Sequence, residues 1–333
     1  EPIDAEEVGH LIALAYPERI AHATDHAGNF KMSNGNMLFI DPSDSMAANE
    51  WLAIASLNLA STSSSNPAQR RKGRVFLSAP VNWKNLPAQT CENISWDSKA
   101  MAVKMQQETR IGALIIDSKP IQNANRETVS NIICEAARKD GLSMFDWNES
   151  VHRLQQRVAQ VAEWHPELEI PDLSTEHLLT TARAWLPFYL EEGGKMKTSV
   201  TELKKLNLCE ILWNILPYDL QQEIDRLAPT HIRVPSGSNI RIDYRLGTKA
   251  PVLSVRLQEC FGMTSTPTVD AGRQPLLLEL LSPGFKPVQL TQDLASFWQG
   301  TYFEVRKELK RRYPKHFWPE NPLESQAVRG VKR

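Results

Sequence analysis

Residues 291–319 read TQDLASFWQGTYFEVRKELKRRYPKHFWP, and this stretch decides the last element of the fold. Its apolar side chains recur at steps of three and four residues, which predicts an amphipathic helix. Those side chains are Leu294, Phe297, Trp298, Tyr302, Val305 and Leu309. The prolines of segment 313–319 end the helix, and we expect this segment to fold back because Phe317 and Trp318 need burial.

The same helix carries a basic cluster in its last turns, where cations complement the helix dipole. The cluster consists of Arg306, Lys307, Lys310, Arg311 and Arg312. From residue 301 to residue 333, nine Lys and Arg stand against four Glu, a local charge of +5 in a chain with a net charge of −1. This asymmetry indicates an anionic partner, although a solvated helix face has the same pattern. We expect Phe297, Trp298 and Tyr302 to be core. Lys307, Arg311 and Arg312 should face solvent.

A length of 333 residues predicts two or three domains, and 41% hydrophobic with 23% charged residues is typical of a soluble globular chain. No run approaches the roughly eighteen apolar residues of a membrane helix, and the acidic N-terminus does not resemble a signal peptide. Because the chain opens with Glu1 rather than Met, we expect a piece of a longer protein. Four separated cysteines form no CxxC pair, which favours reduced thiols and a cytoplasmic location.

The first part of the chain is predicted to be a β domain over residues 17–120, after the end of a preceding helical domain at residues 1–16. Short strands are expected at residues 19–23, 29–33, 37–41, 51–59 and 74–79, with a later pair at 100–105 and 111–116. Asn34-Gly35 is a strong signal for a two-residue hairpin turn. Several short strands fit a small closed barrel or a sandwich, and residues 61–69 form a Ser/Asn-rich loop.

Residues 121–229 are predicted to form a helical segment. Helices are expected at residues 125–139, 150–165, 178–190 and 203–227. Gly141 is a plausible stop for the first of them, Ser174 is a good N-cap for the third, and Pro217 should start a new helix within the last. Gly193-Gly194 is expected to be a helix break.

Residues 230–333 are predicted to form a mixed α/β module with hairpins and the final amphipathic helix. Strands at 231–234 and 240–244 are joined by the loop Pro235-Ser-Gly-Ser-Asn239, and alternation places Arg233 and Arg241 on its polar face. Another strand is expected at 251–257, and a second hairpin joins strands at 276–281 and 287–290. The three parts together predict an α+β fold.

Catalytic motifs are absent from the sequence. Gly193-Gly194-Lys195 is no phosphate loop, because Tyr189 and Met196 occupy the positions that require Gly and Ser or Thr. His22 and His26 stand near a Gly-Asn turn and are read as loop residues rather than metal ligands. Ser236-Gly237-Ser238 lacks the spacing of a nucleophile elbow.

Several long strings closely resemble the C-terminal module of the HrpB-type bacterial DEAH-box helicases. They are LAPTHIRVPSGSNIRIDY at 227–244, PVLSVRLQECFG at 251–262, LSP at 281–283, PVQLTQDL at 287–294, and FWQGTY at 297–302 with the run to Pro322. Upstream, LAYPERI at 14–20, SNG at 33–35 and GAL at 112–114 resemble the OB-like region that follows the helicase core. The resemblance covers nearly the whole chain except the serine-rich insert at 60–69.

The resemblance implies an OB-like small β-barrel followed by a helicase-associated module, taken from the C-terminal half of such a helicase. The family couples ATP hydrolysis to movement on nucleic acid through two RecA-like domains, whose motifs this chain lacks. ATP and Mg²⁺ would therefore belong to the missing core, and no cofactor is expected here. The expected partners are single-stranded RNA or DNA and the core domains of the parent chain, with no membrane.

Two functions follow as hypotheses. The favoured one is a non-catalytic accessory region that contacts single-stranded nucleic acid. The alternative is a protein-interaction module that tethers the helicase to a partner through the segment 313–319. Steep salt dependence is expected only of the first. The candidate contacts are Arg233, Ser236, Ser238, Arg241, Lys307, Arg311, Arg312 and Lys315.

Overall fold

A computed structural model describes residues 3–24, 26–58, 72–245 and 250–331 of the chain. These residues form two compact units, residues 1–133 and residues 134–333. The division into four parts made from the sequence stays a prediction, and the serine-rich insert lies outside the described residues. No helix in the described ranges is both long enough and apolar enough to cross a membrane.

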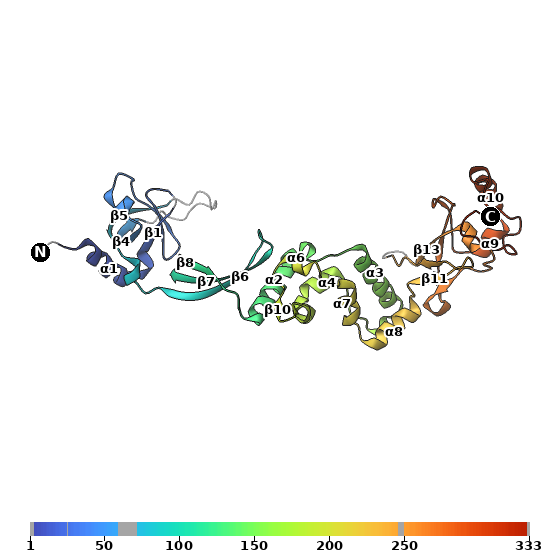
Figure 1. Cartoon of the computed structure of the whole chain (residues 1–333), viewed down its shortest axis with the longest axis horizontal. Helices are drawn as coiled ribbons and strands as arrows, with labels where there is room; N and C mark the ends of the chain where they lie inside the picture. The colour runs from blue at the N-terminus through green and yellow to red at the C-terminus, as the bar shows by residue number, and fades with distance from the viewer. Residues whose placement is uncertain (1–2, 25, 59–71, 246–249, 332–333) are drawn as a thin grey trace. The chain divides into compact units, whose positions relative to one another are not determined.

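The first unit contains a closed five-stranded barrel (blue in Figure 1), as the strand pattern predicted. Its strands are β1 (Ile20–Ala23), β2 (Asn29–Met32), β3 (Met37–Phe39), β4 (Trp51–Asn58) and β5 (Gly73–Pro80). They close in the order β1-β2-β3-β5-β4, with β3 and β5 parallel and the other pairs antiparallel. Alternate residues of these strands, such as Phe30, Leu38 and Leu52, fill the barrel interior. Helix α1 (Ala5–Ala15) packs against β4 and β5.

A three-stranded antiparallel sheet follows the barrel. It consists of β6 (Gln89–Asp97), β7 (Ala102–Ile111) and β8 (Leu114–Pro120). The strand predicted at 111–116 corresponds to β8 but begins later, at Leu114, because Gly112 turns the chain with a φ of +55° between β7 and β8. Strand β6 was missed, because its residues are exposed or half-buried and lack an apolar alternation.

The middle of the chain is helical. Its helices are α2 (Arg126–Met144), α3 (Glu149–Trp164), α4 (Thr175–Thr180), α5 (Ala182–Trp185), α6 (Val200–Leu203), α7 (Leu208–Ile215) and α8 (Tyr218–Leu227). Short 3-10 turns, η5 (Pro166–Leu168) and η6 (Leu186–Tyr189), follow α3 and α5. Ser174 caps α4 and Pro217 precedes α8, both as predicted.

Three local predictions in this segment were wrong. Helix α2 runs through Gly141, where a Cβ atom would lie 2.3 Å from Cδ2 of Leu179, so the glycine serves packing rather than termination. The helix expected at 178–190 is divided into α4, α5 and η6. Gly193 and Gly194 are not a helix break but the turn of a small hairpin of β9 (Glu191–Glu192) and β10 (Lys195–Met196), with φ values of +59° and +79°.

A buried histidine joins the end of α3 to the C-terminal module. His165 Nδ1 lies 2.7 Å from Oε1 of Glu167, and its Nε2 lies 2.6 Å from Oδ1 of Asp270, in the turn η8 (Asp270–Gly272). Hydrogen bonds to Asp270, and then to Glu167, raise the pKa of His165 above its ordinary value. The imidazole therefore lies between two carboxylates that favour its protonated form, and Nη2 of Arg273 lies 2.9 Å from its Nε2.

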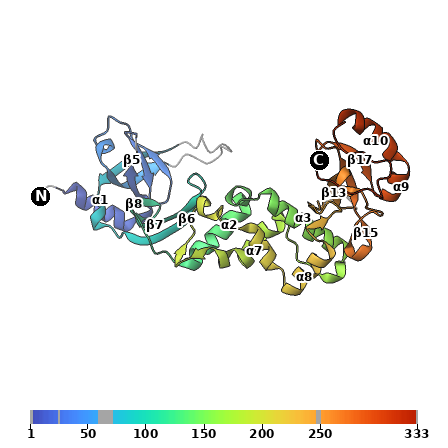
Figure 2. The same ribbon diagram turned by 45° about the vertical axis from the view of Figure 1, so that its right-hand side comes forward.

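The C-terminal module (orange and red in Figure 2) combines hairpins with two helices. Strands β11 (His231–Arg233) and β12 (Asn239–Arg241) form the first hairpin. Strands β13 (Val252–Arg256), β16 (Leu277–Leu281) and β17 (Pro287–Thr291) form a sheet in which β13 and β16 are parallel. The turn η7 (Leu257–Cys260) follows β13, and β14 (Thr268–Val269) pairs with β15 (Gln274–Pro275).

The single final helix predicted from the sequence is in fact two, α9 (Leu294–Gln299) and α10 (Thr301–Arg312), because Gly300 leaves the helical conformation. The expected core was right, since Phe297, Trp298 and Tyr302 are all buried. The segment after α10 folds back as expected, with Trp318 buried and its Nε1 donating to the carbonyl oxygen of Tyr313.

Candidate nucleic-acid interface

The β11–β12 hairpin presents the two arginines that alternation places on its polar face. Both Arg233 and Arg241 are exposed, whereas Val234 and Ile242 are buried. Nε of Arg241 lies 3.8 Å from Oδ1 of Asp243, so this cation is partly neutralised. Arg233 has no carboxylate within ion-pair distance in the part of the chain that the structure describes.

A second arginine meets Arg233 over the turn of the hairpin. Gly237 has a φ of +82°, and a Cβ atom at this position would lie 3.2 Å from Nη2 of Arg329 and 3.7 Å from Nη2 of Arg233. Nε of Arg329 also donates to the carbonyl oxygen of Ser236 at 3.2 Å. Both guanidinium groups therefore reach the same turn, and like charges near one another repel, which makes the site favourable for an anion. Sequence reasoning missed Arg329 and counted it only within the basic tail.

The two serines of the turn are held from below by a buried carboxylate. Oγ of Ser236 and Oγ of Ser238 donate to Oε1 of Glu259 at 2.9 and 2.6 Å. Nε of Arg256 donates to the other oxygen, Oε2, at 3.1 Å. The hydroxyl protons of both serines therefore already have an acceptor within the protein.

Burial pushes the pKa of Glu259 upward, but the hydrogen bonds from Ser238, Ser236 and Arg256 outweigh it and hold this pKa below its ordinary value. Glu259 is only 3% exposed, so its ionised form depends on these three donors. The turn is consequently fixed by a charge-assisted network rather than by apolar packing.

The neighbouring residue Gln258 contacts the C-terminal segment of the chain through both its side chain and its backbone. Its side-chain Nε2 donates to the carbonyl oxygen of Phe317 at 3.0 Å, and its backbone carbonyl oxygen accepts from the Val328 amide at 3.1 Å. Nδ1 of His316 lies 3.2 Å from its Oε1. The turn η7 thus contacts the hairpin through Glu259 and the folded-back segment through Gln258.

Helix α10 and the segment that follows it present the second group of candidate cations. The candidates Lys307, Arg311, Arg312 and Lys315 are all exposed. Arg312 pairs with Glu308 at 3.2 Å, but the other three have no carboxylate partner among the described residues. Arg306 differs, because its Nε donates to the carbonyl oxygen of Trp318 at 3.0 Å and so serves the fold.

The turn between β16 and β17 contacts one residue near each group of cations. The ring of Phe285 stands 4.9 Å from Cζ of Arg256, which Glu259 holds. On the other side, a Cβ atom at Gly284 would lie 2.8 Å from the hydroxyl oxygen of Tyr313, the residue that caps α10. Sequence reasoning treated the hairpin and the helix separately, and it had no signal for these long-range contacts.

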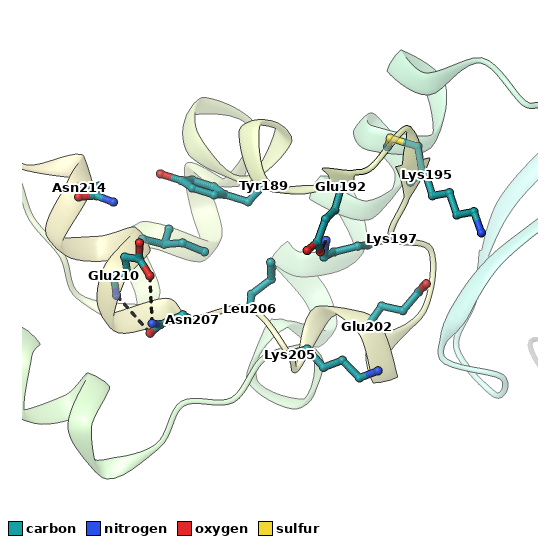
Figure 3. A pocket seen from close by; sticks show the side chains of 12 residues that line it. Tyr189, Glu192, Lys195, Lys197, Glu202, Lys205, Leu206, Asn207, Glu210 and Asn214 are labelled. Atoms are coloured by element: carbon teal, nitrogen blue, oxygen red, sulfur yellow. Dashed lines mark hydrogen bonds and ion pairs between the residues drawn. The ribbon is translucent and has the colours of Figure 1, made fainter.

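A separate cleft of about 520 Å³ lies between the β9–β10 hairpin and α7 (Figure 3). Figure 3 shows Glu192 and Lys197 turned toward each other, with Nζ to Oε2 at 2.5 Å, while Lys195 extends away from them. Cations and carboxylates alternate along this cleft, so its charge gives no preference for an anion. Across the described residues, no three His, Cys, Asp or Glu side chains group as a metal site would.

Comparison with known proteins adds a family to this geometry. Residues 185–322 match the HrpB C-terminal family model, described as ATP-dependent helicase C-terminal. The chain is 33% identical over 336 residues to the ATP-dependent RNA helicase HrpB of Escherichia coli (strain K12). The alignment covers 99% of this chain and 40% of that protein.

Two crystal structures of E. coli HrpB are also similar. One, described as a DExH-box NTPase, has a TM-score of 0.59 and 33% identity over 98% of this chain and 40% of that chain. The other, described as a DEAH/RHA helicase, has a TM-score of 0.52 and 31% identity over 93% of this chain and 38% of that chain. This chain thus spans about two fifths of the length of the relatives it matches.

Proposed function

The chain corresponds to the C-terminal region of HrpB-type ATP-dependent helicases, and on this premise we propose that it is a non-catalytic accessory region that binds single-stranded nucleic acid. The observation that carries this proposal is the meeting of Arg233 and Arg329 over the turn at Gly237. Arg233 has no carboxylate partner in the described ranges, and Arg329 uses its Nε on a backbone carbonyl. A phosphodiester is the anion that a helicase region would encounter most often.

The cations of α10 support the same proposal in a different way. Lys307, Arg311 and Lys315 extend into solvent without partners among the described residues. Exposed cations of this kind attract a polyanion over a distance set by the Debye length, without fixing its position. The helix would attract the nucleic-acid strand electrostatically, and the hairpin would bind one of its phosphates.

Under this proposal, the helicase core and this C-terminal region of the parent protein have different functions. ATP and Mg²⁺ binding are assigned to the helicase core, a hydrolase located in the cytoplasm, and this region is assigned to the strand that the core moves. The E. coli relative is named an RNA helicase, so single-stranded RNA is the first ligand to test and DNA is its comparison.

The protein-tethering alternative required the segment 313–319 to offer its aromatic side chains to a partner. Trp318 is only 6% exposed, and the hydroxyl of Tyr302 donates to the carbonyl oxygen of Pro319 at 2.8 Å. The segment is therefore occupied inside its own module, which favours the nucleic-acid proposal.

The test is anisotropy of a labelled oligouridylate titrated with the chain at increasing salt. The logarithm of the association constant should fall linearly with the logarithm of salt, by about 0.7 per phosphate contact on a single strand. Absent or salt-independent binding would contradict the proposal and favour the alternative of a protein-interaction module.

The non-catalytic part of the proposal has its own measurement. Because the sequence has neither a P-loop nor a DEAH box, the purified chain should release no phosphate from ATP, with or without RNA. Release above that of a mock preparation would contradict it.

A further inference from the structure

Phe285 has an unusual position in the turn between β16 and β17. Its φ is +61°, in the left-handed region that favours glycine, although Gly284 directly precedes it. The turn is closed by the Phe285 amide, which donates to the carbonyl oxygen of Ser282 at 2.9 Å. A bulky side chain at this position strains the backbone, and such strain often marks a functional residue.

Burial does not explain the phenylalanine either. The residue is 66% exposed, so its ring contributes little to the core. One contact orients it, the guanidinium of Arg256 at 4.9 Å from the ring centre. Because Glu259 holds Arg256 in turn, the ring is presented in a fixed orientation with most of its surface open.

Two series of contacts connect the turn of Phe285 with residues that neighbour the candidate cations. On one side, Glu259 links Arg256 to Ser236 and Ser238 of the turn at Gly237, near which the side chains of Arg233 and Arg329 lie. On the other side, Ser282 and Gly284 contact Tyr313, which follows Arg312 and precedes Lys315. An exposed aromatic ring among phosphate-attracting cations is the arrangement that proteins use to bind single strands without sequence readout.

We propose that Phe285 stacks against one base of a single strand whose phosphates lie along the cations of the hairpin and α10. This inference rests on the proposed function and adds to it the residue that contacts a base. A stacking contact is tolerant of sequence, and the larger rings of purines should bind more tightly than pyrimidines.

The decisive variant is Phe285→Gly, because it removes the ring and relieves the left-handed strain at once. Its thermal midpoint should equal or exceed that of the wild type. Its affinity for labelled oligoadenylate should fall about 5- to 150-fold, the usual effect of losing one stacked base. The slope of affinity against salt should not change, because no charge is removed.

Two further variants serve as controls. Phe285→Tyr keeps an aromatic ring and should bind within about twofold of the wild type. Phe188→Ala removes a ring that is 80% exposed in η6, which belongs to neither the hairpin nor α10, and should leave affinity unchanged.

The outcomes separate the two proposals. If the wild type binds with a clear salt slope and Phe285→Gly binds equally well, stacking is wrong while the proposed function stands. If Phe285→Gly melts well below the wild type and Phe285→Tyr fails to restore affinity, the ring is structural and the inference falls. If the wild type binds no oligonucleotide, the proposed function fails, and stacking fails with it.

Discussion

The β11–β12 hairpin and helix α10 both bring cations to the surface of the C-terminal module, but the module supports them differently. Beneath the hairpin, the buried carboxylate of Glu259 fixes both serines of the turn. Beneath α10, the buried side chains of Tyr302 and Leu309 fix the helix, and Lys307 and Arg311 are exposed without a carboxylate partner among the described residues. The hairpin therefore preorganises the backbone turn next to its charges, whereas the helix only concentrates its charges. A polar network can be broken by one substitution, but a row of solvated charges cannot.

The largest effect should come from the apolar support of the helices. Trp298 is 2% exposed, stacks near Phe297 and Tyr302, and donates from Nε1 to the carbonyl oxygen of Met263. Trp298→Ala should lower the free energy of unfolding by about 3–5 kcal/mol, the usual cost of truncating a large buried aromatic residue.

The matched comparison is the triple variant Lys307→Ala, Arg311→Ala and Arg312→Ala, measured in the same thermal melts. Because these charges are exposed, their removal should cost less than about 1 kcal/mol. A triple variant that melts below Trp298→Ala would show that the basic cluster is structural, and α10 would lose its role as a recognition face.

The next largest effect should come from the polar support of the hairpin. Glu259→Ala leaves Ser236, Ser238 and Arg256 without their shared acceptor, which should cost about 1–3 kcal/mol in urea unfolding. Glu304→Ala, an exposed carboxylate of α10, is the control and should change stability by less than about 0.5 kcal/mol. Equal effects of the two variants would contradict the preorganisation of the hairpin.

The same carboxylate predicts how stability depends on pH. The pKa of Glu259 is lowered in the folded chain, so its contribution is complete above the unfolded value of 4.5 and is lost as pH falls through the folded value. Urea midpoints of the wild type should therefore decline below about pH 4.5 more steeply than those of Glu259→Gln. Parallel curves for the two proteins would show that Glu259 is not held ionised.

A smaller effect is expected from the arginines themselves, and it separates two neighbours on one hairpin. Arg233→Ala should reduce the salt slope of oligouridylate binding by about 0.7, the value for one phosphate contact on a single strand. Arg241→Ala should reduce it less, because Asp243 already lies 3.8 Å from Arg241.

The control for both variants is Arg226→Ala, which removes an arginine that pairs with Glu223 on α8. It should leave the slope unchanged. If Arg233→Ala and Arg241→Ala also left affinity and slope unchanged, the hairpin would not contact phosphate, and the convergence over Gly237 would have another cause.

Much of this architecture could be predicted from the sequence because it is local. The turn Asn34-Gly35, the cap Ser174 and the alternation around Arg233 each act within a few residues, so their patterns are visible in the chain itself. Apolar spacing at three- and four-residue steps likewise predicted that Trp298 and Tyr302 lie on one buried stripe. It failed at Gly300, where one glycine divides a continuous apolar pattern into two helices.

The supports of the candidate interface could not be predicted, because each joins residues far apart in the sequence. Glu259 lies 23 residues from Ser236, and Arg329 lies 93 residues from the same serine. No periodicity relates such positions. A glutamate at the end of an apolar strand could equally have been a surface residue, and only the fold shows that it is buried beneath the turn.

The smallest effect concerns the ion pair between Arg312 and Glu308 within α10. Nη1 of Arg312 lies 3.2 Å from Oε1 of Glu308, four residues earlier, with both side chains about half exposed. The order, glutamate before arginine, is the favourable one, and the arginine also complements the helix dipole. A double-mutant cycle of Arg312→Ala and Glu308→Ala should give a coupling of about 0.3–0.5 kcal/mol, and this coupling should shrink at high salt because solvent screens an exposed pair. A coupling as large as the cost of Glu259→Ala, or one that salt leaves intact, would mean that α10 holds its charges in place as the hairpin does. The two surfaces would then bind a strand by the same mechanism, since both would be preorganised.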